Sequence, residues 1–235
     1  MLKRTAAASR RRQRGLSIVE LMVGVAVGLF VVAAASMLVA AQLSDNRRLS
    51  LEMQVQQDLR AAADIITREL RRSGHWARAR EGVGQPGNVN PYRAVQKFDG
   101  SVFADGEVST DVLLSYARSG NEADDNNALD AAEQLGFRLN SGVIETRLGG
   151  AGWQALTDSA TLNVTAFTLA MRVQPVRLEC TKPCPGPGDC RPVLQVRDIT
   201  LDITGQAAHD ASVQRRLTSD VRLRNDAVIA GSCPP

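Results

Sequence analysis

Four cysteines in the last third of the chain have the residue type and spacing that most directly imply chemistry: Cys180, Cys184, Cys190 and Cys233. Four thiols can form two disulfides or bind one zinc ion. The intervals between the first three cysteines differ from the paired C-x2-C arrangement typical of zinc sites. The sequence therefore predicts disulfides and leaves the pairing open. A bridge from this proline-rich and glycine-rich segment to Cys233 would hold the C-terminus and contribute about 4 kcal/mol in the chain-entropy model.

A second group of candidate ligands is the run of acids and amides at residues 121–133. Carboxylate and amide oxygens are calcium ligands, but an EF-hand loop also needs a central glycine, which this run lacks. A solvated loop is the favoured interpretation, with calcium binding as the alternative. No metal site is predicted.

Catalytic motifs are missing from the sequence. It contains no G-x-S-x-G, H-E-x-x-H, P-loop or Rossmann fingerprint. Of the two histidines, His75 and His209, the second is followed by Asp210, and this pair is interpreted as part of a turn. We therefore predict a protein that is no enzyme and needs no cofactor.

Charge is unevenly distributed, although the net value is only +3. Residues 1–15 hold six of the 28 basic residues and no acid, so the rest of the chain has 22 basic against 25 acidic residues. A mildly acidic body lacks the concentrated basic surface that nucleic-acid binding requires. Acidic residues interrupt a small basic cluster near the C-terminus, so the cluster indicates a solvent-facing strand and not a nucleic-acid site. Its members are Arg215, Arg216, Arg222 and Arg224.

An apolar segment follows the basic N-terminus. Leu21–Ala41 contains no charged residue, and as a helix it would be about 31 Å long, close to the thickness of a bilayer core. The basic flank predicts that residues 1–15 stay in the cytoplasm and that the body lies outside. A secretory signal peptide, a twin-arginine signal and a plain single-pass anchor are the alternatives.

Glu20 is the unusual residue of this segment, because a carboxylate beside an apolar span is costly unless it is paired or lies at the interface. If the chain is cut after Gly15, Leu16 gains a free amine and Glu20 becomes the fifth residue, one helical turn away. Glu20 could then pair with that amine or with the amine of a neighbouring subunit. The alternative is a carboxylate that simply lies at the membrane interface.

Gly24 and Gly28 form a G-x-x-x-G pattern in the same span. This spacing allows close helix packing. Glycine is also common in membrane helices in general, so both interpretations stay open.

Periodicity predicts an α+β fold. Apolar residues at positions 51, 55, 59, 62, 66 and 70 form one helical stripe, and Ser73-Gly74 should end the helix. Residues 75–110 are interpreted as an extended loop. Strand patterns follow at 112–116, 137–139, 143–148, 167–173, 199–203 and 221–224, with a hairpin turn at residues 140–142. We expect a long N-terminal helix, with a transmembrane half and an amphipathic half, packed on an antiparallel β-sheet domain.

Residues 14–22, Arg-Gly-Leu-Ser-Ile-Val-Glu-Leu-Met, resemble the class III signal of type IV prepilins. The resemblance implies cleavage between Gly15 and Leu16 by a prepilin peptidase, methylation of the new amine of Leu16, and subunit pairing through Glu20. Leu16 stands where phenylalanine is commoner in this family, and the change is tolerated there.

Later segments resemble PilW-type minor pilins and the related PulJ-type pseudopilins, namely residues 69–76, 111–116, 137–142, 152–158 and 221–225. This implies a minor pilin that takes part in initiation and assembly of a type IV pilus. The alternatives are a type II secretion pseudopilin and a membrane-anchored extracytoplasmic binding domain.

The partners implied are prepilin peptidase, other minor and major pilins, the inner-membrane assembly platform and the membrane itself, with no nucleic acid. The expected location is the inner membrane, single-pass, with the C-terminal domain in the periplasm, and after assembly the extracellular pilus. The expected organisation is a leader at 1–15, a filament-core helix at 16–42, its amphipathic continuation at 43–74 and a β-rich domain at 75–235.

Overall fold

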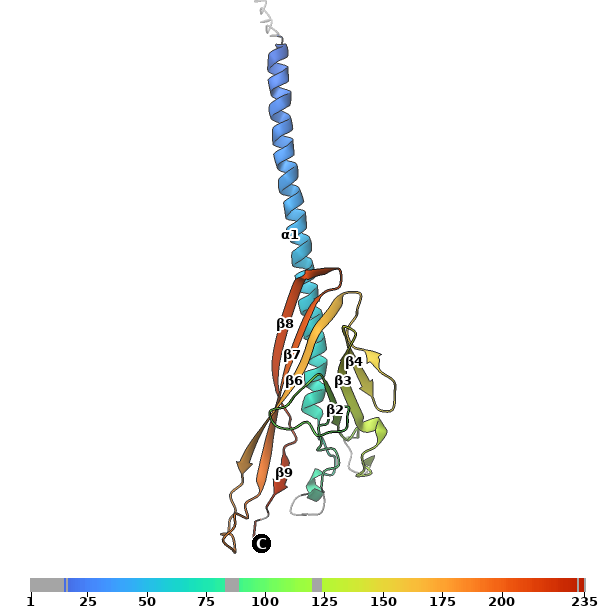
Figure 1. The fold of residues 1–235 in the computed structure, drawn as a ribbon, viewed down its shortest axis with the longest axis vertical. Helices are drawn as coiled ribbons and strands as arrows, with labels where there is room; N and C mark the ends of the chain where they lie inside the picture. Colours follow the sequence, from blue (N-terminus) through green and yellow to red (C-terminus); the bar gives the residue numbers. More distant parts are fainter. Residues whose placement is uncertain (1–14, 16, 83–88, 120–123, 232, 235) are drawn as a thin grey trace, which may run out of the picture. The chain divides into compact units, whose positions relative to one another are not determined.

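The structure is a computed structural model, and it describes residues 15, 17–82, 89–119, 124–231 and 233–234 (Figure 1). The chain divides into two compact units, Met1–Leu49 and Ser50–Pro235, which are described separately below.

One long helix, α1 (Ile18–Arg72), begins in the first unit and ends in the second. It stops where the sequence predicts, because Gly74 has a φ of 75°, a left-handed conformation that suits glycine. The predicted stripe is confirmed: Val55, Leu59, Ile66 and Leu70 are buried, and Ala62 with them. The part of α1 in the second unit is therefore held by its apolar face.

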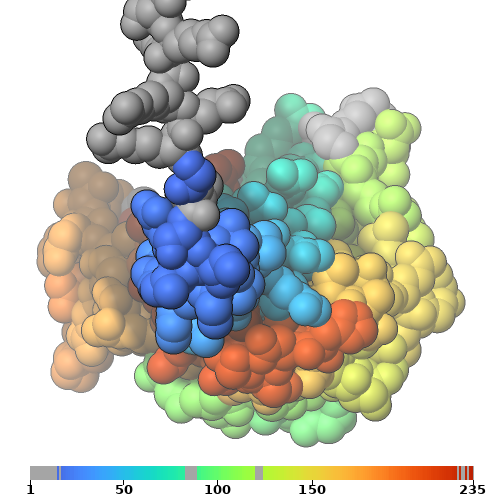
Figure 2. Space-filling view, turned by 90° about the horizontal axis from the view of Figure 1, so that it is seen from above, coloured from blue at the N-terminus to red at the C-terminus, as the bar shows by residue number. Residues whose placement is uncertain are grey.

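The larger sheet has five strands in the order β1-β6-β7-β8, with β9 also paired to β7. Their bounds are β1 (Val108–Ser109), β6 (Leu162–Arg177), β7 (Val193–Ala207), β8 (Asp210–Arg222) and β9 (Ala227–Ala230). The pairings are antiparallel, and β6 pairs with β7 along nearly its whole length. The turn between β7 and β8, orange to red in Figure 2, lies beside the yellow start of β6, where the amide of Ala208 donates to the carbonyl of Thr161 at 3.1 Å.

The smaller sheet has four antiparallel strands in the order β2-β3-β4-β5. These are β2 (Asp111–Ser115), β3 (Gln134–Asn140), β4 (Val143–Leu148) and β5 (Gln154–Ala155). The predicted hairpin turn is confirmed, because β3 and β4 are joined by Ser141 and Gly142, which both have positive φ. Two central residues with positive φ are the signature of a type I′ turn, which matches the twist of a hairpin.

One hydrophobic core joins the second half of α1 to both sheets. Phe137 and Ile144 come from the smaller sheet, and Phe167, Leu201 and Ile203 from the larger one; all are buried. Polar contacts add to this packing: Thr161 donates to Asp58 at 2.9 Å, and Arg215 pairs with Glu52. The expected α+β fold, a long helix packed on antiparallel strands, is confirmed, and the strands form two sheets.

Several segments differ from the pattern-based expectations, and the short strands β5 and β9 were not predicted. The last predicted strand, 221–224, overlaps only the end of β8, which starts at Asp210 and stops at Arg222. The start of this strand was missed because polar residues along most of β8 hide its periodicity. Residues 75–110 are mostly irregular, as expected, with a short 3-10 helix, η1 (Ala79–Gly82), and β1. They are nevertheless well packed in their described part, since Tyr92, Val95 and Phe103 are buried.

A buried arginine holds the C-terminal segment to the sheet. Arg197 on β7 is 7% exposed; its Nη1 donates to the carbonyl of Arg93 at 2.6 Å and its Nη2 to that of Asn225 at 2.8 Å. Burial lowers the pKa of Arg197 because desolvation disfavours the charged form. The sequence pattern gave no sign of this residue, whose type is normally exposed.

Candidate functional site

The N-terminal half of α1 presents apolar side chains to solvent on every side within its own unit. Ile18, Val25, Phe30 and Leu38 are all more than half exposed. Among the described residues, α1 is the one helix long and apolar enough to cross a membrane. Exposed apolar surface of this extent needs lipid or other helices to cover it.

The helix begins close to the predicted cleavage point. Gly15 lies outside the helix, and the amide of Leu21 donates to the carbonyl of Ser17 at 3.1 Å, so Ser17 precedes the first turn. Glu20 lies in that first turn and is exposed. An acid there is favourable, because the N-terminal end of a helix carries partial positive charge. Leu16, the predicted site of methylation, lies outside the described residues.

Gly24 and Gly28 are one turn apart on α1 and therefore share a face. A Cβ added at either glycine would meet no atom within 4 Å. Among the described residues of its own unit this face is open, and the predicted helix-packing role of the two glycines stays a prediction.

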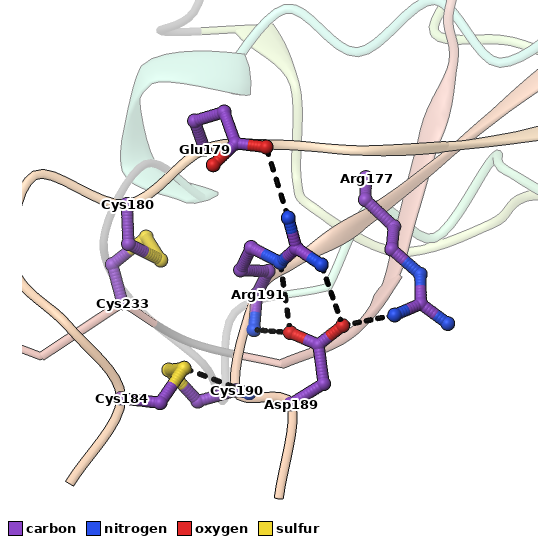
Figure 3. The surroundings of a disulfide bond; sticks show 8 residues. All are labelled: Arg177, Glu179, Cys180, Cys184, Asp189, Cys190, Arg191 and Cys233. Carbon is purple, nitrogen blue, oxygen red and sulfur yellow. Dashed lines mark hydrogen bonds and ion pairs between the residues drawn. A yellow bond between two sulfur atoms is a disulfide. The ribbon is translucent and has the colours of Figure 1, made fainter.

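All four cysteines form disulfides, as predicted, and the pairing is Cys180–Cys233 and Cys184–Cys190 (Figure 3). The first bridge spans 53 residues and joins the end of β6 to the segment after β9. The second closes a loop of six residues within the turn-rich segment between β6 and β7. The segment after β9 is thus tied to the end of β6 in the larger sheet.

An exposed ion-pair cluster lies beside these disulfides (Figure 3). The guanidinium of Arg191 contacts Asp189 at 2.9 Å and Glu179 at 2.9 Å, and Arg177 also pairs with Asp189. Hydrogen bonds from Arg191 hold the pKa of Asp189 well below its usual range. Because the cluster is exposed, it orders the segment more than it stabilises the fold.

The acidic run at 121–133 is only partly the solvated loop that was expected. Residues 121–123 lie outside the described part, but Asp125 is 3% exposed and accepts a hydrogen bond from the hydroxyl of Tyr92 at 2.9 Å. Glu133 and the carbonyl of Ala128 also lie within 3.2 Å of that hydroxyl. The residues that the structure describes include no group of three metal-ligating side chains. The described part of this run is therefore anchored to the fold through Tyr92.

The small arginine cluster near the C-terminus is divided among separate ion pairs. Arg215 pairs with Glu52, Arg216 with Asp202 and Arg222 with Asp226. Each pair offsets one positive charge, so these three arginines form no basic stripe. His209 lies in the turn between β7 and β8, as expected.

A long apolar N-terminal helix, a β domain with two antiparallel sheets and two disulfides together define a pilin-like protein. A family model described as "Prepilin peptidase-dependent protein B" matches residues 48–223, and one described as "Prokaryotic N-terminal methylation motif" matches residues 10–36. The first match covers more than half of the chain, which therefore belongs to the prepilin peptidase-dependent protein B family. No curated protein and no solved structure matches it.

Membership of this family has direct consequences. The chain is a type IV prepilin-like protein of a non-enzymatic family, and dependence on prepilin peptidase is implied. The disulfides indicate that the β domain is extracytoplasmic, because such bridges persist in oxidising compartments.

Proposed function

We propose that this chain is a minor pilin that takes part in initiating and assembling a type IV pilus. The observation that carries the proposal is the apolar half of α1, which starts just after Gly15 and is exposed along its length. Within its unit it has no apolar surface to pack against among the described residues. Such a helix suits storage in a bilayer first and packing among other helices afterwards.

The processing steps follow from the N-terminal sequence. Prepilin peptidase would cut between Gly15 and Leu16 and methylate the amine of Leu16. Glu20 would then pair with the N-terminal amine of a neighbouring subunit, since an unpaired carboxylate is costly in an apolar helix bundle. Gly24 and Gly28 would let the neighbouring helix approach closely.

In this proposal residues 1–15 form a cytoplasmic leader, 16–42 the filament-core helix, 43–74 its amphipathic continuation and 75–235 the periplasmic domain. The precursor would lie in the inner membrane, and its partners would be major and other minor pilins and the assembly platform. A type II secretion pseudopilin is the second candidate, because it would share every N-terminal feature. An anchored domain outside any filament is the third.

The test is mass spectrometry of fibres sheared from cells. Trypsin should release a peptide from Leu16 to Arg47, because no lysine or arginine lies between them. A processed subunit gives this peptide with one added methyl group. In an unprocessed chain trypsin cuts after Arg14, so the peptide runs from Gly15 to Arg47. It contains one more glycine residue than the processed peptide and carries no added methyl group.

The same preparation tests the role of Glu20. Glu20→Ala should leave the processed protein in the membrane but strongly reduce its amount in the fibres. Asp45→Ala is the matched control, because Asp45 is an exposed acid on the same helix. Equal incorporation of both variants would contradict the pairing role. Absence of the methylated peptide from good fibre preparations, together with a secretion defect in the deletion strain, would favour the pseudopilin.

A further inference from the structure

The second unit contains an arginine-lined cleft at the C-terminal end of α1. The cleft has a volume of about 680 Å³, and five arginines line it. They come from three parts of the chain: Arg68, Arg71 and Arg72 from the last turns of α1, Arg118 after β2, and Arg224 after β8. We refer to it as the arginine cleft. Folding has gathered these charges from positions up to 156 residues apart, between Arg68 and Arg224.

Positive charge in the arginine cleft is poorly compensated. Among the described residues that line it, Asp64 is the one acid. Arg72 pairs with Glu69 at 3.5 Å, and Arg118 reaches the carbonyl of Ala132 at 3.5 Å. Arg68, Arg71 and Arg224 are exposed, and none of their three guanidinium groups makes a hydrogen bond or ion pair within the described part of the chain.

The arginines are not needed to complete the helix end. The carbonyl of Ser73 accepts from the side-chain amide of Asn225 at 2.9 Å, that of Gly74 from Asn90 at 2.8 Å, and that of Arg72 from the amide of His75 at 3.0 Å. Arg71 and Arg72 do complement the negative end of the helix dipole. The helix dipole does not explain Arg118 and Arg224, which line the same cleft but lie outside α1.

We propose that the arginine cleft binds an acidic peptide segment of a partner protein. Guanidinium groups bind carboxylates through paired hydrogen bonds, and several groups around one cleft suit a ligand with several carboxylates. The cleft extends well beyond one small anion, as a neighbouring hollow of about 530 Å³ shares Arg71 and Arg224. This proposal does not rest on the proposed function, which only suggests that the partner is another filament subunit.

A nucleic acid fits the cleft less well than a peptide. Single-stranded nucleic acids are bound by stacking several bases on aromatic side chains, and among the described residues that line the cleft there is no phenylalanine, tyrosine or tryptophan, with His75 as the one aromatic ring. The nearby Tyr116 is buried beneath the guanidinium of Arg72, 4.4 Å from its ring centroid, so its face is already covered.

The experiment is fluorescence anisotropy with the full-length chain in a neutral detergent and a labelled peptide of alternating glutamate and glycine. We expect binding that weakens as salt rises, and no binding of the matching glutamine peptide. The double variant Arg71→Ala/Arg224→Ala should bind about tenfold more weakly, since each exposed charge contact contributes modestly. Arg60→Ala/Arg172→Ala is the matched control and should bind like the parent, because both arginines are exposed and lie outside the cleft.

Several results would overturn the proposal. These are no binding of the glutamate peptide, equal weakening in the control variant, or full competition by inorganic phosphate, which would indicate a small-anion site. Tighter binding of oligothymidylate that is lost in the cleft variant would indicate a nucleic-acid site instead. Thermal unfolding of both variants shows whether each still folds. If the cleft variant misfolds, it is replaced by Arg71→Gln/Arg224→Gln, which keeps much of the side-chain volume. This variant should also bind the glutamate peptide about tenfold more weakly than the parent.

Discussion

The chain has only two tyrosines, and each hydroxyl lies against a carboxylate. Tyr92 is fully buried and its hydroxyl lies 2.9 Å from Asp125, while the hydroxyl of Tyr116 lies 3.0 Å from Glu69. Burial raises the pKa of both phenols above the ordinary value of 10.0, and the neighbouring carboxylates add to the effect. Both side chains therefore stay neutral in the folded protein well into alkaline pH.

We predict that the folded protein shows little tyrosinate absorbance at pH 10, where the urea-unfolded chain is about half ionised. Because the folded-state pKa values are raised, these tyrosines contribute stability below pH 10 that is lost as pH rises above it. The free energy of unfolding should fall there by up to about 1.4 kcal/mol per pH unit for each tyrosine. Ultraviolet titration of folded and unfolded protein is the measurement, and Tyr92→Phe should remove one of the two groups. A folded-state titration at the ordinary pKa would contradict the prediction.

Packing between α1 and the larger sheet depends on a glycine in β7. A Cβ at Gly205 would lie 2.7 Å from Cδ1 of Leu162 and 3.2 Å from Cδ2 of Leu59. Both leucines are almost completely buried, so neither can move aside into free space. The absence of a side chain at Gly205 therefore allows the second half of α1 to approach the sheet.

We predict that Gly205→Ala lowers the free energy of unfolding by about 1–3 kcal/mol, because it overpacks the core. Gly150→Ala is the control, since a Cβ there meets nothing within 4 Å and its φ is not positive. Urea unfolding followed by circular dichroism gives both values. A loss at Gly205 no larger than at Gly150 would show that the helix and sheet have room to spare.

At the level of the whole chain, the two disulfides constrain very different lengths of polypeptide. Cys180–Cys233 closes 53 residues, including all of β7, β8 and β9, whereas Cys184–Cys190 closes six. In the chain-entropy model the stabilisation grows with the logarithm of loop length. The long bridge should therefore contribute more to the fold, and the short one mainly orders its own loop.

We predict that Cys180→Ser/Cys233→Ser lowers the free energy of unfolding by about 4 kcal/mol, and Cys184→Ser/Cys190→Ser by about 2 kcal/mol. Each double variant keeps the other bridge, so each is a control for the other. Denaturant unfolding under non-reducing conditions measures the difference. The reverse order of the two losses would mean that native-state contacts, and not loop length, determine the contribution of each bridge.

Much of the fold could be predicted because its pattern is local. The buried stripe of α1, the alternation in β6 and β7, and the turn at Ser141 and Gly142 each depend on residues a few positions apart. The start of β8 could not be found in this way, since polar side chains occupy most of the strand. The buried positions of Arg197 and Asp125 were also missed, because their burial depends on partners 28 or more residues distant along the chain.

The sequence by itself determined the class of protein, since the N-terminal motif, the apolar span and the even number of cysteines are readable without a fold. Tertiary structure alone decided which cysteines pair, how the strands divide between two sheets, and where Arg68, Arg71, Arg118 and Arg224 meet. The physical reason is distance along the chain. Local propensity and periodicity act over one or two helical turns, whereas disulfides, sheet order and charge clusters join segments that only folding brings together.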